Sequence, residues 1–363
     1  MKRINLIQYL FLVLSFTIIF SSCDDDNDTI SGIFSDGVFI TNEGAWGAGN
    51  GSVSYYSYAG DTLTNQIFKS VNGRALGDVI QSLTVYKNKA YIVANASNKI
   101  EIVNSYDFIE QGVITDVSSP RYFIGINSKK GYVSQWGEEG LVKVIDLEGL
   151  AVTKSIEVGA GPEHLIYHNG YVYVANSGGL GNDNTISVID PSTDEVVKTI
   201  TLDGDSPSDF AVDANDDLWV LCYGYIEYDP VTYATLSESA SKLIRINTIT
   251  KEVAQTITIS ETQHPTCLEA SRNGDHIYYA CGYGFAGIYK MSITDTEVPT
   301  TPLLDKSFYG FNINSETGNI FAMEAPSFTA NGKLWRYDIN GNELGSYEAG
   351  IGPNSSTSKK SRN

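Results

Sequence analysis

The chain has 363 residues, of which 42% are hydrophobic and 18% are charged, and its formal net charge is −19. This composition is typical of a folded globular protein and excludes extended disorder. An acidic chain repels the phosphate backbone of nucleic acids, so we expect no nucleic-acid partner.

Residues 1–22 have the features of an export signal. Lys2 and Arg3 precede a short apolar stretch that ends near Phe20, and the small residues of "FSSC" lead to Cys23. A short apolar core followed by a small-residue cleavage segment indicates a signal peptide rather than a membrane span. The segment resembles the lipobox of bacterial lipoproteins, which implies a lipid anchor on Cys23. The alternative is plain secretory cleavage near Ser22.

Residues 23–34 form an acidic linker that begins with "CDDDND". Acidic runs are usually solvated linkers. Acidic residues directly after a lipidated cysteine also resemble the surface-export signal of Bacteroidetes lipoproteins. That resemblance implies a location on the extracellular face of the outer membrane, with membrane contact through the lipid anchor only.

Two strand patterns then recur seven times between residues 35 and 353. One pattern is exemplified by "YVYVANSG" (171–178), and the other, by "TISVIDP" (185–191), follows each copy of the first. The copies of the first pattern end at Asn42, Asn95, Trp136, Asn176, Cys222, Cys281 and Glu324. A period of about 40 to 45 residues with four strands per unit is the signature of a propeller blade. We therefore predict an all-β fold, a single seven-bladed β-propeller of four-stranded antiparallel blades.

The two ends of the chain are expected to share one blade. Each blade starts with a strand announced by Pro or Gly, as in "GPEHLIYH", but the first blade has none before Gly37. The matching signal, "GIGP" (350–353), lies near the C-terminus, so N- and C-terminal strands should close the ring. Residues 354–363 ("NSSTSKKSRN") are polar, make a poor inner strand and are assigned as a tail; the sequence leaves open whether this tail closes the first blade.

The repeats resemble a known family. "GVFITNEGAWG", "NGRALGD", "KAYIVANASNKIEIV" and "TISVIDPSTDEVVKTI" are similar to the YncE-like propeller lipoproteins of Bacteroidetes, and in particular to the BtuG-type lipoproteins that capture vitamin B12. The resemblance covers about residues 35–350. It implies capture of a corrinoid (cobalamin) at the cell surface for a TonB-dependent outer-membrane transporter. The alternatives are another bulky ligand (siderophore, haem or glycan), or an adhesion or scaffold propeller without a small ligand.

The loops after the "YVAN"-type strands should gather around one mouth of the central channel. They carry aromatic residues, which offer flat contact area for recognition, and asparagines, which both donate and accept hydrogen bonds. The predicted ligand-binding residues at this mouth are Asn42, Glu43, Trp46, Asn95, Arg121, Tyr122, Trp136, His164, Asn176, Tyr223, Tyr225, Tyr283, Phe285 and Phe328. The alternative is structural: strand-end asparagines often bond to their own turns, and loop aromatics can pack on neighbouring loops.

No motif of a hydrolase nucleophile (G-x-S-x-G) or of a zinc protease (H-E-x-x-H) is present. We therefore expect a binding protein and not an enzyme, with no catalytic cofactor and no metal site. Because successive side chains on a strand point to opposite faces, the strand positions predict a disulfide between Cys222 and Cys267. The same alternation directs Cys267 and Cys281 to opposite faces of one blade. The alternative is that Cys222, Cys267 and Cys281 are free thiols.

Overall fold

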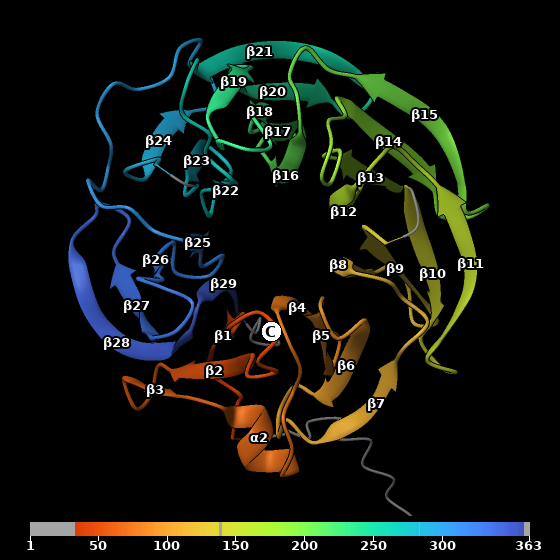
Figure 1. Cartoon of the computed structure of the whole chain (residues 1–363), viewed down its shortest axis with the longest axis vertical. Coiled ribbons are helices and arrows are strands. Elements are labelled where there is room, and N and C mark those ends of the chain that lie inside the picture. Colours follow the sequence, from red (N-terminus) through yellow and green to blue (C-terminus); the bar gives the residue numbers. More distant parts are fainter. Residues whose placement is uncertain (1–32, 138–139, 283, 359–363) are drawn as a thin grey trace, which may run out of the picture. The chain divides into compact units, whose positions relative to one another are not determined.

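Seven antiparallel sheets surround a central axis, which confirms the predicted propeller (Figure 1). The computed structural model describes residues 33–137, 140–282 and 284–358. The predicted signal peptide, Cys23, Tyr283 and residues 359–363 lie outside the described residues.

Blades two to seven have their lowest-numbered strand next to the axis, whereas in blade one β29 takes that place. Blade one contains β29 (Pro353–Ser358), β1 (Gly37–Asn42), β2 (Ser52–Ser57) and β3 (Thr62–Thr64); blade two, β4 (Ile80–Tyr86), β5 (Lys89–Ala94), β6 (Lys99–Asn104) and β7 (Glu110–Ile114); blade three, β8 (Pro120–Gly125), β9 (Lys130–Gln135), β10 (Leu141–Asp146) and β11 (Ala151–Glu157); blade four, β12 (Pro162–His168), β13 (Tyr171–Asn176), β14 (Thr185–Asp190) and β15 (Glu195–Thr201). Blade five contains β16 (Pro207–Val212), β17 (Leu218–Cys222), β20 (Ser241–Asn247) and β21 (Glu252–Ser260); blade six, β22 (Cys267–Ala270), β23 (His276–Ala280) and β24 (Tyr289–Ser292); blade seven, β25 (Gly310–Ile313), β26 (Ile320–Glu324), β27 (Asn331–Tyr337) and β28 (Glu343–Ile351).

The position of a strand in its blade explains its sequence. The second strands are covered on both faces by neighbouring blades, so they are almost continuously apolar, and every residue of β1 and β17 is buried. The outermost strands face solvent on one side and alternate, as in β15. The core is therefore a series of apolar layers between blades; Tyr173 of blade four packs in one layer with Val220 of blade five.

Three features depart from simple repetition. In blade six, the segment at Leu304 takes the place of a fourth strand and forms an isolated antiparallel bridge with Ile288. Blade five carries an inserted hairpin, β18 (Ile226–Tyr228) and β19 (Thr235–Glu238). A helix of six residues, α2 (Ile67–Asn72), packs on β2. Across the described part of the chain, no helix is long and apolar enough to span a membrane.

The chain ends share blade one, as predicted, but the boundary of the expected polar tail is corrected. β29 extends to Ser358 and pairs with β1, so residues 354–358 form the innermost strand of that blade instead of a tail. In Figure 1, β29 in blue lies beside β1 in red.

Lateral hydrogen bonds explain how so polar a segment forms an inner strand. Thr357 Oγ1 donates to the Leu83 carbonyl at 2.7 Å, and the backbone N–H of Ser356 donates to Asn312 Oδ1 at 2.6 Å. The neighbouring inner strand does the same, because Thr84 Oγ1 donates to a backbone carbonyl of β8. Hydroxyl and amide side chains thus join the inner strands to one another, and a row of apolar side chains is not needed there.

The predicted Cys222–Cys267 disulfide is not present. All three cysteines in the described residues are free thiols. Cys222 packs in the layer between blades four and five, whereas Cys267 packs between blades six and seven. An extended backbone at Cys281 would direct its side chain away from the face of Cys267, but φ there is 66°, and Cys281 packs in the same apolar layer as Cys267.

Candidate functional site

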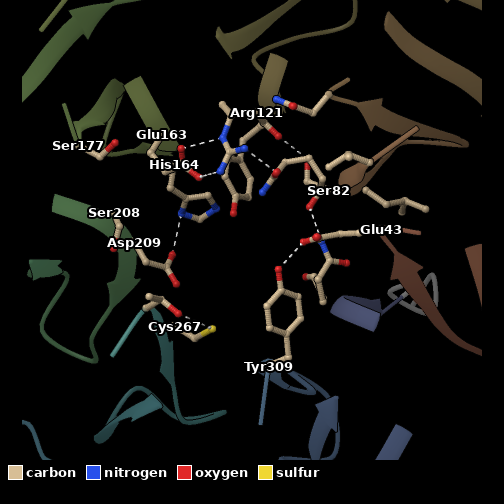
Figure 2. A pocket seen from close by; sticks show the side chains of 18 of the residues that line it. Glu43, Ser82, Arg121, Glu163, His164, Ser177, Ser208, Asp209, Cys267 and Tyr309 are labelled. Atoms are coloured by element: carbon tan, nitrogen blue, oxygen red, sulfur yellow. Dashed lines mark hydrogen bonds and ion pairs between the residues drawn. The ribbon is translucent and has the colours of Figure 1, made fainter. Parts of the chain in front are cut away.

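The central channel forms a cavity of about 2300 Å³ that residues from all seven blades line. At the mouth, Trp46 and Leu180 line it, and it continues along β4 as far as Lys87. Figure 2 shows side chains from opposite walls of this cavity pointing toward one another. The cavity therefore extends along the inner strands and is not limited to the loops of the mouth.

Bulges at the start of the inner strands direct polar side chains into the cavity. The register shifts at this point in blades one to five, for example between Pro120 and Phe123 in β8 and between Pro162 and Leu165 in β12. A β-bulge places two residues opposite one and redirects their side chains. A proline is tolerated as the first residue of such a strand, because it need not donate to the ladder there.

Arg121 makes three side-chain hydrogen bonds within the cavity wall. Its guanidinium donates to both carboxylate oxygens of Glu163 at 2.8 and 2.7 Å, and to Gln81 Oε1 at 2.6 Å. Its carbon Cζ also lies 4.1 Å from the centre of the Trp136 ring. Desolvation acts to lower the pKa of Arg121, but Glu163 outweighs it and the pKa is raised. Arg121 is therefore a charged strut between blades two, three and four, and its charge is balanced by Glu163.

Glu43 connects the blade that closes the ring to its neighbour. Its Oε1 accepts hydrogen bonds from the Tyr309 hydroxyl at 3.0 Å and from Asn354 Nδ2 at 3.2 Å. Burial raises the pKa of Glu43, while these two hydrogen bonds act in the opposite direction. The loop after β1 is thereby tied to blade seven and to β29.

His164 and Asp209 form an ion pair on the opposite wall. His164 Nδ1 lies 2.9 Å from Asp209 Oδ1 (Figure 2). The imidazole ring meets Tyr122 edge to face, with 4.6 Å between the ring centres. Desolvation acts to lower the pKa of His164, but Asp209 and then Glu163 outweigh it and the pKa is raised. The charged imidazolium form is therefore favoured more than in water.

Glu269 and Asn312 add a neutral pair to the wall. Asn312 Nδ2 donates to Glu269 Oε1 at 2.5 Å. Burial, followed by the nearby Asp209 charge, raises the pKa of Glu269 to about 8. At neutral pH the carboxyl group is then largely protonated and can both donate and accept hydrogen bonds.

The rim of the mouth carries aromatic rings. Trp46 is 78% exposed in the loop after β1, and that loop is held in place by the hydrogen bond from the Gly47 N–H to Asp78. Phe328 is 44% exposed and meets Tyr309 edge to face at 5.4 Å. Exposed aromatic side chains on a rigid scaffold are typical of recognition surfaces.

Residues 36–350 match the family described as "Domain of unknown function (DUF5074)". The chain belongs to this family. No curated protein matches the chain. Among solved structures, it is similar to a quinonprotein alcohol dehydrogenase-like protein from Bacteroides thetaiotaomicron, with 16% identity over 90% of this chain and 78% of the other, at a TM-score of 0.68.

Two further structures share the propeller of this DUF5074 member. They are putative 6-phosphogluconolactonases from Bacteroides fragilis (12% identity, 90% of this chain, 98% of the other, TM-score 0.66) and Bacteroides uniformis (12% identity, 89% and 99%, TM-score 0.65). At these identities the likeness shows the fold alone.

The structure brings most of the predicted site residues of the DUF5074 chain to the cavity, but not all. The residues that line it are Glu43, Trp46, Asn95, Arg121, Tyr122, Trp136, His164, Tyr223 and Phe328. Asn42, Asn176, Tyr225 and Phe285 do not line it, and Tyr283 lies outside the described residues.

Packing inside the blades explains three of these corrections. Asn42 and Asn176 are fully buried, and each donates its side-chain amide to a serine of the next strand, Ser54 at 2.9 Å and Ser187 at 3.0 Å. Phe285 is 3% exposed and packs within an apolar layer. The two asparagines and Phe285 therefore stabilise the fold.

The loop-based prediction missed a ring of polar residues on the inner strands and directly before them. They are Gln81, Glu163, Asp209, Glu269, Asn312, Tyr309 and Asn354. A sequence signal for part of this ring exists, because Arg121, Glu163 and Asn354 each directly follow the proline that opens an inner strand. Within the described residues, no group of three or more His, Cys, Asp and Glu side chains is arranged to hold a metal ion.

Proposed function

We propose that this propeller is a surface lipoprotein that captures a corrinoid at the channel mouth and passes it to a TonB-dependent outer-membrane transporter. The observation that carries the proposal is one large cavity with exposed aromatic rings at its rim and a hydrogen-bonding wall below. The lipobox-like "FSSC" and the acidic residues after Cys23 support anchoring at the cell surface.

The volume of the cavity favours a bulky ligand. Pockets for drug-sized molecules are about 300–1,000 Å³, and the channel of about 2300 Å³ exceeds that range. A corrinoid is a large, nearly planar ring with amide groups around its edge. Such a ligand would fill the mouth, whereas a small metabolite would leave most of the channel unoccupied.

The chemistry of the wall suits amides. Gln81 and Asn312 carry amides, and the protonated Glu269 offers a donor and an acceptor. Trp46 and Phe328 offer apolar faces against which a planar ring can stack. The charged groups Arg121 and Glu163 satisfy each other, so the wall presents a fixed, largely neutral surface.

The inserted hairpin of blade five suggests where a protein partner would bind. Every residue of β19 is exposed, and Val231, Tyr233 and Leu236 are 82%, 78% and 59% exposed. A lone two-stranded hairpin is marginally stable by itself. We propose that the transporter covers this apolar surface; deletion of residues 226–238 should then weaken the complex with the transporter and leave corrinoid affinity unchanged.

Titration calorimetry with cyanocobalamin tests the ligand. Tight binding with a negative heat-capacity change is expected, because apolar surface is buried. Trp46→Ala should weaken binding about 30-fold, since truncating an aromatic anchor often costs about 2 kcal/mol or more. Tyr233→Ala is the matched control, because Tyr233 is also 78% exposed but does not line the cavity.

Two results would contradict the proposal. Absence of heat and of any thermal shift with cyanocobalamin would exclude corrinoids, and haem, siderophores and glycans would then be titrated in the same way. An equal loss of corrinoid affinity in Trp46→Ala and Tyr233→Ala would place the binding site away from the mouth. If no small ligand binds, an adhesion or scaffold role is favoured.

A further inference from the structure

Two thiols meet in the wall of the channel, at the start of blade six. Cys267 is the first residue of β22 and lines the cavity beside Asp209 (Figure 2). In the strand register Cys267 pairs with Ala280, so Cys281 lies one position beyond the paired residue. Cys281 is 1% exposed and lies in the apolar layer against which Cys267 packs.

The backbone at Cys281 differs from that of its equivalents in the other blades. The seven strand-end positions are Asn42, Asn95, Trp136, Asn176, Cys222, Cys281 and Glu324, and among them only Cys281 has a positive φ, of 66°. L-residues other than glycine and asparagine rarely adopt this left-handed conformation. Asn42 and Asn176 bond to the next strand of their own blade, whereas Cys281 shares an apolar layer with Cys267 of the channel wall.

The surroundings give the two sulfurs different accessibility. Both cysteines contact the apolar layer between blades six and seven, but only Cys267 reaches the cavity. Burial, and then the neighbouring Cys267, raises the pKa of the Cys281 thiol. A reagent that enters the channel therefore meets Cys267 first, with Cys281 held behind it as a protonated thiol. Cys222 is fully buried in a different layer and does not belong to this pair.

We propose that Cys267 and Cys281 are a redox-active pair that closes to a disulfide in the channel wall. The oxidant is a small organic disulfide such as glutathione disulfide. The Cys267 thiolate attacks one sulfur of that disulfide, the S–S bond of the reagent breaks, and the first thiol leaves. Cys281 then loses its proton to solvent, and its sulfur attacks Cys267 Sγ and releases the second thiol. Two protein thiols are oxidised, and one reagent disulfide is reduced to two thiols.

Whatever ligand is captured, Cys267 takes the attacking role because it faces the channel. Cys281 takes the resolving role because it is buried behind Cys267. Oxidation would replace the Cys267 thiol, a weak hydrogen-bond donor in the wall, with a disulfide that has no donor.

Peptide mapping of the folded full chain tests the pair. The protein is treated with glutathione disulfide, denatured, alkylated and digested with trypsin without reduction. Cleavage at lysine and arginine places Cys222, Cys267 and Cys281 on the separate peptides 199–242, 252–272 and 273–290. We expect peptides 252–272 and 273–290 to be joined with the loss of two hydrogens, and peptide 199–242 to carry an alkylated cysteine.

Three variants separate the roles. Cys281→Ser should accumulate a stable mixed disulfide of glutathione on Cys267, because no resolving thiol remains. Cys267→Ser should leave Cys281 unmodified, and Cys222→Ser should form the cross-link as the unaltered chain does. A link between peptides 199–242 and 252–272 would overturn the proposal. So would full alkylation of Cys267 and Cys281 in the treated unaltered chain, a result that does not depend on any variant folding.

Discussion

Removing Arg121 from its ion pair with Glu163 should cost several kcal/mol, and Arg121→Leu measures that cost. Glu163 is 7% exposed and accepts two hydrogen bonds from the guanidinium. Removing one partner of a buried pair costs about 3–5 kcal/mol, because the remaining charge is left uncompensated. Two hydrogen bonds to charged groups, at about 1.5–3 kcal/mol each, give a similar range. Since the channel opens to solvent, which can hydrate the unpaired carboxylate, we expect the lower end, about 3 kcal/mol.

Urea denaturation, monitored by circular dichroism, measures this loss of unfolding free energy. Arg121→Leu also removes the bond to Gln81 and the contact with Trp136, so Glu163→Gln and the double variant complete a cycle that isolates the pair. The double variant should be more stable than Arg121→Leu alone. Lys129→Leu is the control, because Lys129 and Glu148 lie 3.5 Å apart with side chains 71% and 65% exposed. Such surface pairs contribute about 0–1 kcal/mol. If Arg121→Leu costs no more than Lys129→Leu, the assignment of Arg121 as a strut is wrong.

Three other predictions follow from the wall and the closing strand. Because the folded protein raises the pKa of Glu269 to about 8, above its value in the unfolded chain, its contribution to stability is largest at low pH and is lost as pH rises toward 8. Between pH 5 and pH 8, urea denaturation should show a larger loss of unfolding free energy for the unaltered chain than for Glu269→Gln. Equal losses would contradict the raised pKa of Glu269. Asn42→Ala removes hydrogen bonds to Ser54 and from the Gly350 N–H, so it should destabilise the fold by about 1–3 kcal/mol with ligand affinity unchanged. Weaker binding in a fully stable variant would show instead that Asn42 contacts the ligand. Truncation after Ser358 should leave thermal unfolding cooperative, whereas truncation after Pro353 removes most of β29 and should abolish that cooperativity. Identical melting curves for the two truncated chains would show that β29 does not close the ring.

The recurring strand patterns were sufficient to predict the number of blades and their phase. Two of the "YVAN"-type strands follow a two-residue turn, as β13 follows Asn169 and Gly170, and turn chemistry fixes where such a strand starts. Continuous apolar runs identify second strands because neighbouring blades cover both of their faces. Local sequence and tertiary packing favour the same structure at these positions, which is why the sequence repeats alone predict the blades.

The candidate site was less predictable, because it depends on loop and bulge geometry that the alternation of apolar and polar residues along a strand does not encode. Trp46 and Phe285 occupy comparable loops, yet one is 78% and the other 3% exposed, since the path of each loop decides what covers its ring. The bulges that direct Glu163 and His164 into the channel interrupt regular alternation. The polar sequence of β29 was interpreted as a tail because its lateral bonds, such as that of Thr357, involve residues distant in sequence.

The closing strand also constrains the order in which the molecule can fold. Thr41 of β1 hydrogen bonds with Asn354 of β29, and the two residues are 313 positions apart. Contacts of such sequence separation form slowly, because the entropy of closing a long loop is lost before the contact is gained. β1 emerges from the ribosome among the first strands, yet its inner edge stays unpaired until residues 353–358 have been synthesised. Blade one should therefore be the last to acquire protection from hydrogen exchange during refolding, although its strands β1 to β3 are the first of the propeller to be made.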